Sequence, residues 1–260
     1  MINKRKVRRF VSLMVFLGLL LAIMLVSCNM LGGNTLKVGL YESSRPLTFL
    51  DEKKTISGFE VDFAKLLAEN LDRKLKIKLL DPENMVNALE DGSVDCIISV
   101  RKSVHNLIEN FRSTEPFISY GVVIVVQPDN ETLLDENDLH KHNVGVMINT
   151  DAELLCEEFL KTNAFNVRKY DIESQPFHDL TLKQNHAVIA DELYSRFMQK
   201  ENPDSYKILE PVYVRKQFGL KLSRKLTQDD IQKIESEILK LKSDSAFKAL
   251  YLDWFGHDLG

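Results

Sequence analysis

Apolar positions recur along this chain with two different periods, and segments of the two kinds alternate. Residues 36–41 and 74–80 alternate apolar and polar side chains, which predicts strands. Between them, apolar residues recur at helical spacing, which predicts one buried face on a helix: Phe59, Phe63, Leu66, Leu67 and Leu71. A short helix is expected from Pro82 to a stop at Gly92, followed by a buried strand in the apolar run 94–100. The order strand, helix, strand, helix, strand predicts an α/β sheet.

The second half of the chain repeats this rhythm. Strands are expected at 120–128, 142–148 and 166–171, and again where the apolar segment 187–190 precedes a helix. Further helices are expected after Thr150 and around Leu180 and Leu182. Two more strands, 206–211 and 212–223, precede two closing helices between 227 and 256. The pattern therefore predicts two similar α/β halves without short repeats.

Two acids at the start of the helix beginning near Phe59 raise the question of acid–base catalysis. Glu60 and Asp62 are two residues apart, so they do not share a helix face. Both fall in the first turn, where the partial positive charge of the helix N-terminus favours carboxylates by about 0.3–1 kcal/mol each. We therefore interpret them as helix-start residues and expect no catalytic pair.

The N-terminus has the pattern of an export signal. Five basic residues between 4 and 9 precede an apolar run from Val11 to Val26, followed by Ser27 and Cys28. The run of about 16 residues is short for a bilayer span of roughly 20, although an uncleaved anchor helix remains the alternative. The sequence from Leu25 to Cys28 resembles the lipobox of bacterial lipoproteins, which implies a signal peptide at 1–27 and acyl chains such as palmitate on Cys28. Several acyl chains would hold the protein at a membrane.

Charge and motifs exclude several classes of function. Without residues 1–27, which carry five basic and no acidic residues, the 34 basic residues fall to 29 against 38 acidic ones, a net charge of about −9. So acidic a protein is a poor partner for nucleic acid. No HExxH, P-loop, GxGxxG, GxSxG or CxxC motif occurs, and the HxH at His140 and His142 is typical of solvated surface. We expect no enzyme activity, cofactor or metal.

The two remaining cysteines leave a choice between a disulfide and two thiols. An exported protein with two cysteines invites a bridge. Cys96, however, lies in a predicted buried strand, and Cys156 lies in a predicted amphipathic helix far along the chain. Two buried thiols are therefore the favoured interpretation.

Six segments, in order and at fitting distances, together resemble the family 3 extracytoplasmic solute-binding proteins of ABC importers. They are GFEVDFAKLLAENL (58–71), NALEDGSVDCIIS (87–99), FRSTEPF (111–117), VGVMINTDAE (144–153), AVIAD (187–191) and SAFKALYLDWFG (245–256). The resemblance covers about 36–256. It implies the type II periplasmic-binding-protein (Venus-flytrap) fold, with two α/β lobes joined by two hinge strands and a ligand held between the lobes.

Mapped onto this chain, the resemblance implies the following organisation. A tether at 28–35 leads to a first lobe formed by 36–117 together with 216–260. The hinges fall at 118–121 and 212–215, and the second lobe spans 122–211. Ligands of such α/β sheets bind at the carboxyl ends of the strands.

The resemblance also assigns ligand contacts to two residues. Asp191, at the end of AVIAD, matches the acid that clamps the ligand's α-amino group, although its position also suits a helix N-cap. Thr150 opens the helix whose N–H groups would take the ligand carboxylate. With Glu153 three residues later, Thr150 also predicts a capping box, and Asp151 places an unhelpful negative charge beside that carboxylate site.

The sequence departs from the family pattern in the rest of the ligand shell. The family's T-x-x-R motif would place an arginine near 105–107, where this chain has His105 and Leu107. Arg101 or Lys102 could replace it, or be solvated surface. Tyr41 stands where many members have an aspartate, and Ser44 where many have a stacking aromatic residue. We include these residues as candidate ligand contacts, with rim packing as the alternative for Tyr41.

These observations lead to one function and one alternative. We expect a monomeric, lipid-anchored extracytoplasmic receptor that binds a small polar solute, an amino acid or a related compound, and delivers it to an ABC permease and ATPase. The alternative is a signalling or adhesive surface lipoprotein on the same fold, not coupled to transport.

Overall fold

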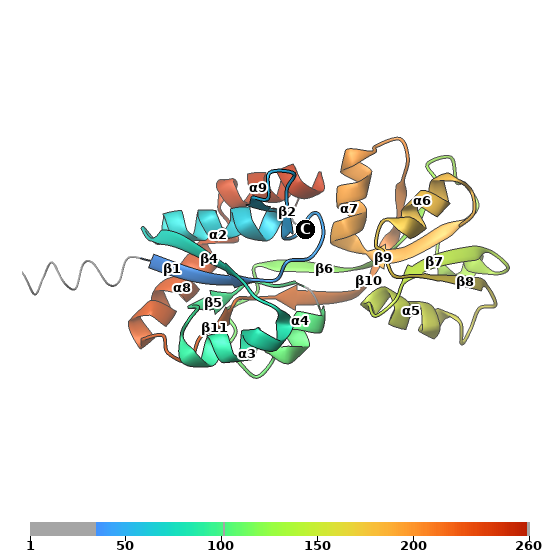
Figure 1. The fold of residues 1–260 in the computed structure, drawn as a ribbon. Helices are drawn as coiled ribbons and strands as arrows, with labels where there is room; N and C mark the ends of the chain where they lie inside the picture. Colours follow the sequence, from blue (N-terminus) through green and yellow to red (C-terminus); the bar gives the residue numbers. More distant parts are fainter. Residues whose placement is uncertain (1–34, 101, 259–260) are drawn as a thin grey trace, which may run out of the picture.

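The computed structural model describes residues 35–100 and 102–258, and Figure 1 shows two lobes side by side, connected by long strands. The signal peptide, the tether before Thr35, Cys28 and Arg101 lie outside the described residues. Within the described part of the chain, no helix is both long enough and apolar enough to cross a bilayer.

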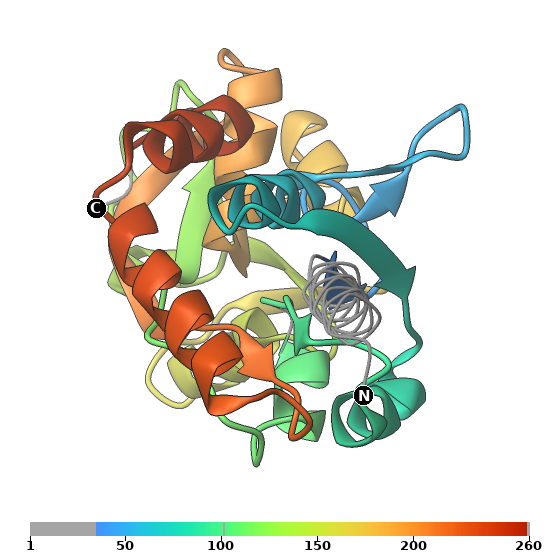
Figure 2. The same cartoon turned by 90° about the vertical axis from the view of Figure 1, so that its left-hand side faces the viewer.

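The first lobe is built on a four-stranded sheet in the order β11-β5-β1-β4. Strand β1 (Thr35–Leu40) pairs in parallel with β4 (Lys74–Leu79) and β5 (Cys96–Ile97), and β11 (Lys221–Leu222) pairs antiparallel with β5. Helices α2 (Phe59–Asn70), α8 (Gln228–Leu241) and α9 (Ser245–Phe255) pack on one face, whereas α3 (Pro82–Asp91) and α4 (Lys102–Leu107) pack on the other. Figure 2 views this lobe end-on. A short hairpin of β2 (Phe49–Leu50) and β3 (Ile56–Ser57) precedes α2.

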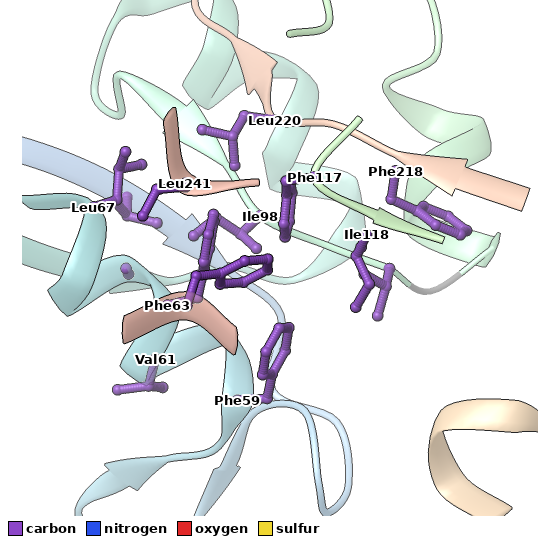
Figure 3. Packing of buried hydrophobic residues seen from close by; sticks show 14 of the residues in the cluster. Phe59, Val61, Phe63, Leu67, Ile98, Phe117, Ile118, Phe218, Leu220 and Leu241 are labelled. Atoms are coloured by element: carbon purple, nitrogen blue, oxygen red, sulfur yellow. The ribbon is translucent and has the colours of Figure 1, made fainter. Parts of the chain in front are cut away.

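Aromatic side chains fill the core of the first lobe. Figure 3 shows Phe63 beside Phe117, and their stacked rings have centroids 4.2 Å apart. The ring centroids of Phe59 and Phe255 are 5.0 Å apart. The apolar face expected for α2 is confirmed, since Phe59, Phe63 and Leu67 are fully buried and the remaining two leucines pack at its edge. The expected start of α3 at Pro82 and its stop at Gly92, in left-handed conformation, are also confirmed.

The second lobe is built on a five-stranded sheet in the order β10-β6-β9-β7-β8. Its strands are β6 (Ile118–Val126), β7 (Asn143–Met147), β8 (Asn166–Tyr170), β9 (Ala187–Asp191) and β10 (Lys207–Phe218). Alternate residues of β6 contribute to two clusters, one with α5 (Asp151–Phe159) and one with α6 (Gln175–Thr181) and α7 (Glu192–Glu201). A 3₁₀ turn, η1 (Glu136–Leu139), precedes β7. This alternation buries both faces of the sheet.

Strands β6 and β10 run side by side from one lobe into the other (Figure 1). Their pairing extends from Lys207 opposite Val126 to Phe218 opposite Ile118, with register shifts on both sides of Tyr213. The expected α/β fold of two lobes with two connecting strands is confirmed, and the lobe boundaries stay a prediction. The two separate strands expected at 206–211 and 212–223 are wrong, because 207–218 forms one strand.

Both described cysteines are buried free thiols, as favoured from the sequence. Cys96 lies in β5 of the first lobe and Cys156 in α5 of the second. Burial raises the pKa of both thiols, that of Cys156 to about 11, so neither is activated as a nucleophile.

Candidate functional site

A cleft of about 660 Å³, including space open to solvent, lies between the lobes beside the strand β6. The first lobe contributes the loop after β1, and the second contributes the N-termini of α5 and α7 and the loop after β8. Its walls carry both charged and apolar side chains: Arg45, Pro46, Leu47, Tyr120, Val122, Asn149, Thr150, Asp151, Ala152, Glu173, Asp191, Leu193 and Tyr194. The cleft therefore lies at the carboxyl ends of β7, β8 and β9, where α/β sheets commonly hold ligands.

Asp191 lines this cleft and caps α7. Its Oδ1 accepts hydrogen bonds from the backbone N–H of Leu193 at 2.9 Å and of Tyr194 at 3.2 Å. The predicted N-cap is therefore confirmed, and the half-buried carboxylate also borders the cleft. Its ligand contact stays a prediction. An Asp cap that also borders a cleft can serve both roles, because a carboxylate accepts several hydrogen bonds.

Thr150 caps α5, but the expected capping box is incomplete, because the Glu153 carboxylate bonds to the residue before the cap. The Thr150 Oγ1 accepts from the Glu153 N–H at 3.2 Å and donates to the Met147 carbonyl at 2.7 Å. The Glu153 carboxylate accepts instead from the N–H of Asn149, at 2.7 Å, and not from the cap N–H. Asn149 has a φ of 59°, which turns the chain so that its own N–H reaches Glu153. The first residues of α5, together with their Thr150 cap, thus belong to the cleft wall.

The negative charge of Asp151 is compensated by the strand β10. Lys216 Nζ lies 2.6 Å from Asp151 Oδ2, with both side chains partly buried. From the sequence alone, the negative charge of Asp151 was expected to repel a ligand carboxylate at this helix N-terminus. The ion pair reduces this repulsion, because Lys216, 65 positions away in the sequence, supplies the opposite charge.

A hydrogen bond joins the two lobes directly across the cleft. Ser44 Oγ, in the loop after β1, donates to Glu173 Oε2 of the loop after β8 at 2.7 Å. Glu173 was not among the residues expected from the sequence. Its position shortly after a parallel strand is the only sequence signal that could have pointed to it.

Three other expected site residues lie elsewhere or are not described. Tyr41 is partly buried against the cluster of Met85, Leu89 and Val104 in the first lobe and does not line the cleft. The rim-packing alternative for this side chain thus agrees with its position. Lys102 begins α4, and its side chain, like the whole of Arg101, lies outside the described part of the chain.

The segment leading to Arg101 is held at the cleft end of the first lobe. The N–H of Val100 donates to Glu60 Oε1 at 3.1 Å, and its carbonyl accepts from the hydroxyl of Tyr120, which lines the cleft. Glu60 also accepts from Thr48 Oγ1 at 2.6 Å and is 2% exposed. The expectation of a merely helix-start role for Glu60 is therefore incomplete, because its carboxylate joins three segments of the first lobe.

The walls of the interlobe cleft carry charged side chains and the N-termini of two helices. Acidic side chains, a positively charged arginine, and a helix N-terminus could together hold a small molecule with both positive and negative groups. Among residues 35–100 and 102–258, no group of three or more His, Cys, Asp or Glu side chains is arranged to hold a metal ion. The arrangement is suited to binding by hydrogen bonds and ion pairs.

Comparison with known proteins shows where this architecture occurs. The family model described as bacterial extracellular solute-binding proteins, family 3, matches residues 36–257. The L-cystine-binding protein TcyJ of Escherichia coli (strain K12) is 27% identical over 228 residues, covering 86% of this chain and 84% of that protein. The putative amino-acid ABC transporter-binding protein PatH of Vibrio harveyi is 24% identical, covering 92% and 95%.

Solved structures show the same fold. The unliganded, open L-cystine solute receptor of Neisseria gonorrhoeae matches with a TM-score of 0.70 at 22% identity, covering 87% of this chain and 94% of that one. An ancestral arginine-binding protein bound to arginine matches with a TM-score of 0.60 at 26% identity, covering 86% and 99%.

Proposed function

We propose, because this chain belongs to the bacterial extracellular solute-binding proteins of family 3, that it is a receptor for an amino acid or a closely related polar solute. A solute-binding role is general to the family. The relatives named for cystine, arginine or unspecified amino acids support this class of ligand. The observation that carries the proposal is the interlobe cleft, which brings Asp191, the N-terminus of α5 and Glu173 together.

The charges in the cleft suggest how such a ligand would lie. Asp191 would accept hydrogen bonds from an α-ammonium group, and the N–H groups at the start of α5, with Thr150, would donate to a carboxylate. The Asp151–Lys216 pair keeps the net charge at that helix end low enough for an anion. Glu173 adds a second acid, which favours a side chain carrying hydrogen-bond donors or positive charge. Ser44 and Arg45, in the loop after β1, would contact the ligand from the first lobe. Arg101 and Lys102, which follow Val100 in the sequence, are proposed as further ligand contacts.

A thermal-shift screen of the full-length protein tests this proposal. Amino acids, polyamines and small carboxylates would each be added at millimolar concentration, and a compound that binds the native state raises the Tm. A ligand at 100 times its Kd adds about 2.7 kcal/mol to the free energy of unfolding. We expect a rise with at least one amino acid. No rise with any class would refute the receptor and favour the signalling or adhesive lipoprotein instead.

The receptor is further proposed to be a monomeric lipoprotein that works with an ABC permease and ATPase. The lipobox-like Leu25–Cys28 segment supports acylation of Cys28. Changing Cys28→Ala is expected to release the protein from the membrane fraction, whereas Asn29→Ala should stay membrane-bound. Membrane association that survives Cys28→Ala would show that lipid on this cysteine is not the anchor. A permease and an ATPase encoded beside this protein would support transport.

A further inference from the structure

A second cleft lies beside the strands that connect the lobes, and it shares no lining residue with the first. It measures about 1060 Å³, including space open to solvent. Its walls come from α7 in the second lobe, from β6 and β10, and from the ends of α8 and α9 in the first lobe. The polar residues that matter here are Glu192, Arg196, Arg215, Lys242, His257 and Asp258. We refer to it as the hinge cleft.

One buried carboxylate, that of Glu192, lies near both arginines of the hinge cleft. Glu192 is 3% exposed, and its Oε2 accepts from the N–H of Gly121 in β6 at 3.0 Å. Arg196 lies 3.6 Å from one oxygen of Glu192, and Arg215 lies 3.9 Å from the other. Two guanidinium groups therefore share one buried acid, at distances longer than a good charged hydrogen bond.

Arg196 has an unmet hydrogen-bonding requirement. Its Nε is buried and has no acceptor anywhere in the part of the chain that the structure describes. Its other acidic neighbour, Glu210, lies 3.5 Å from the terminal nitrogen, and the Glu210 side chain is 70% exposed, so that pair contributes little. Because a buried charged donor without an acceptor is costly, the described chain stabilises the Arg196 guanidinium only in part.

The remaining charges leave the hinge cleft with an excess of cations. Lys242, at the end of α8, forms no ion pair within residues 35–100 and 102–258. Burial, and next the charge of Arg196, lower the pKa of His257, which keeps this imidazole neutral near pH 7. Three cations thus face two lining carboxylates, Glu192 and Asp258, and the former already serves both arginines.

We propose that the hinge cleft binds a small oxyanion, a phosphate or a dicarboxylate, between Arg196 of the second lobe, Arg215 of β10 and Lys242 of the first lobe. Planar guanidinium groups match the paired oxygens of both anions. The oxyanion accepts hydrogen bonds from the terminal nitrogens of the guanidinium groups and reduces the repulsion between the two arginines. Because its contacts come from both lobes and a connecting strand, its binding stabilises this arrangement of the lobes.

Thermal unfolding of the full-length protein in inorganic phosphate tests the hinge-cleft site. Phosphate is titrated to 20 mM against chloride at constant ionic strength, and malonate replaces phosphate in a parallel series. We expect one of the two anions to raise the Tm of the wild type in a saturable way. The half-effect concentration should rise at least tenfold in Lys242→Gln and in Arg196→Lys, which keeps the charge but loses the guanidinium fork.

Two control variants separate this site from other effects of anions. Lys248→Gln removes an exposed lysine of α9 outside the cleft and should respond like the wild type. Arg45→Gln removes an arginine that lines the interlobe cleft and not the hinge cleft, and its anion response should also match the wild type. The proposal is overturned if neither anion acts beyond chloride, if all variants respond equally, or if only Arg45→Gln loses the response.

Discussion

At the scale of single residues, the most informative side chain is Glu60. The sequence placed it correctly in the first turn of α2, where a helix dipole favours an acid. It could not show that the carboxylate is buried, because its partners Thr48 and Val100 lie 12 and 40 positions away. Asp191 is the opposite case, since the cap it forms is local and could be predicted from the residues that follow.

Removing the Glu60 carboxylate should therefore destabilise the first lobe. Glu60→Ala leaves the Val100 N–H and the Thr48 hydroxyl without this acceptor, and each such buried group costs about 1–3 kcal/mol. For the two groups together we expect a loss of about 2–6 kcal/mol in the free energy of unfolding, measured by urea denaturation. Glu69→Ala, on the exposed side of the same helix, should change it by less than about 0.5 kcal/mol. Equal effects of the two changes would contradict the role given to Glu60.

At the scale of elements, periodicity predicted most helices and strands, and it failed at the strand that joins the lobes. Two strands were expected at 206–211 and 212–223, yet β10 runs from Lys207 through Pro211 to Phe218. A proline is tolerated there because β10 is an edge strand, paired only with β6, and its register shifts just beyond Leu209. The alternation of Val122 to Val126 between two cores, by contrast, follows directly from the strand period.

The close approach of β6 and β10 at Gly121 gives a prediction for this element. A Cβ at Gly121 would lie 2.2 Å from the Tyr213 carbonyl oxygen and 2.8 Å from Val212 Cγ1. Gly121→Ala must therefore displace β10 at its irregular stretch, at a cost of about 1–3 kcal/mol. Denaturant unfolding should show this loss of stability. The rise in Tm caused by the solute found in the screen should also be smaller than in the wild type. Ser119→Ala, in the same strand, is the control. Wild-type stability of Gly121→Ala would show that the two strands are not tightly apposed.

At the scale of the whole molecule, the order of elements and six short motifs were enough to predict two lobes and the family. They were not enough to predict the cleft wall, because Ser44–Glu173 and Asp151–Lys216 join residues 129 and 65 positions apart. Tyr41 illustrates the same limit, since matching a family position did not bring its side chain into the cleft. Contacts between lobes depend on how the lobes meet, and local patterns carry no information about that.

The most direct test of the central claim is a calorimetric titration with the solute that raises the Tm most, using the wild type and Asp191→Asn. Asparagine still caps a helix, so the variant should keep its fold while losing the charge in the cleft. We expect one solute per chain and a Kd at least tenfold higher in the variant, about 1.4 kcal/mol of binding free energy. Unchanged affinity in both Asp191→Asn and Glu173→Gln would place the solute outside the interlobe cleft and contradict the account.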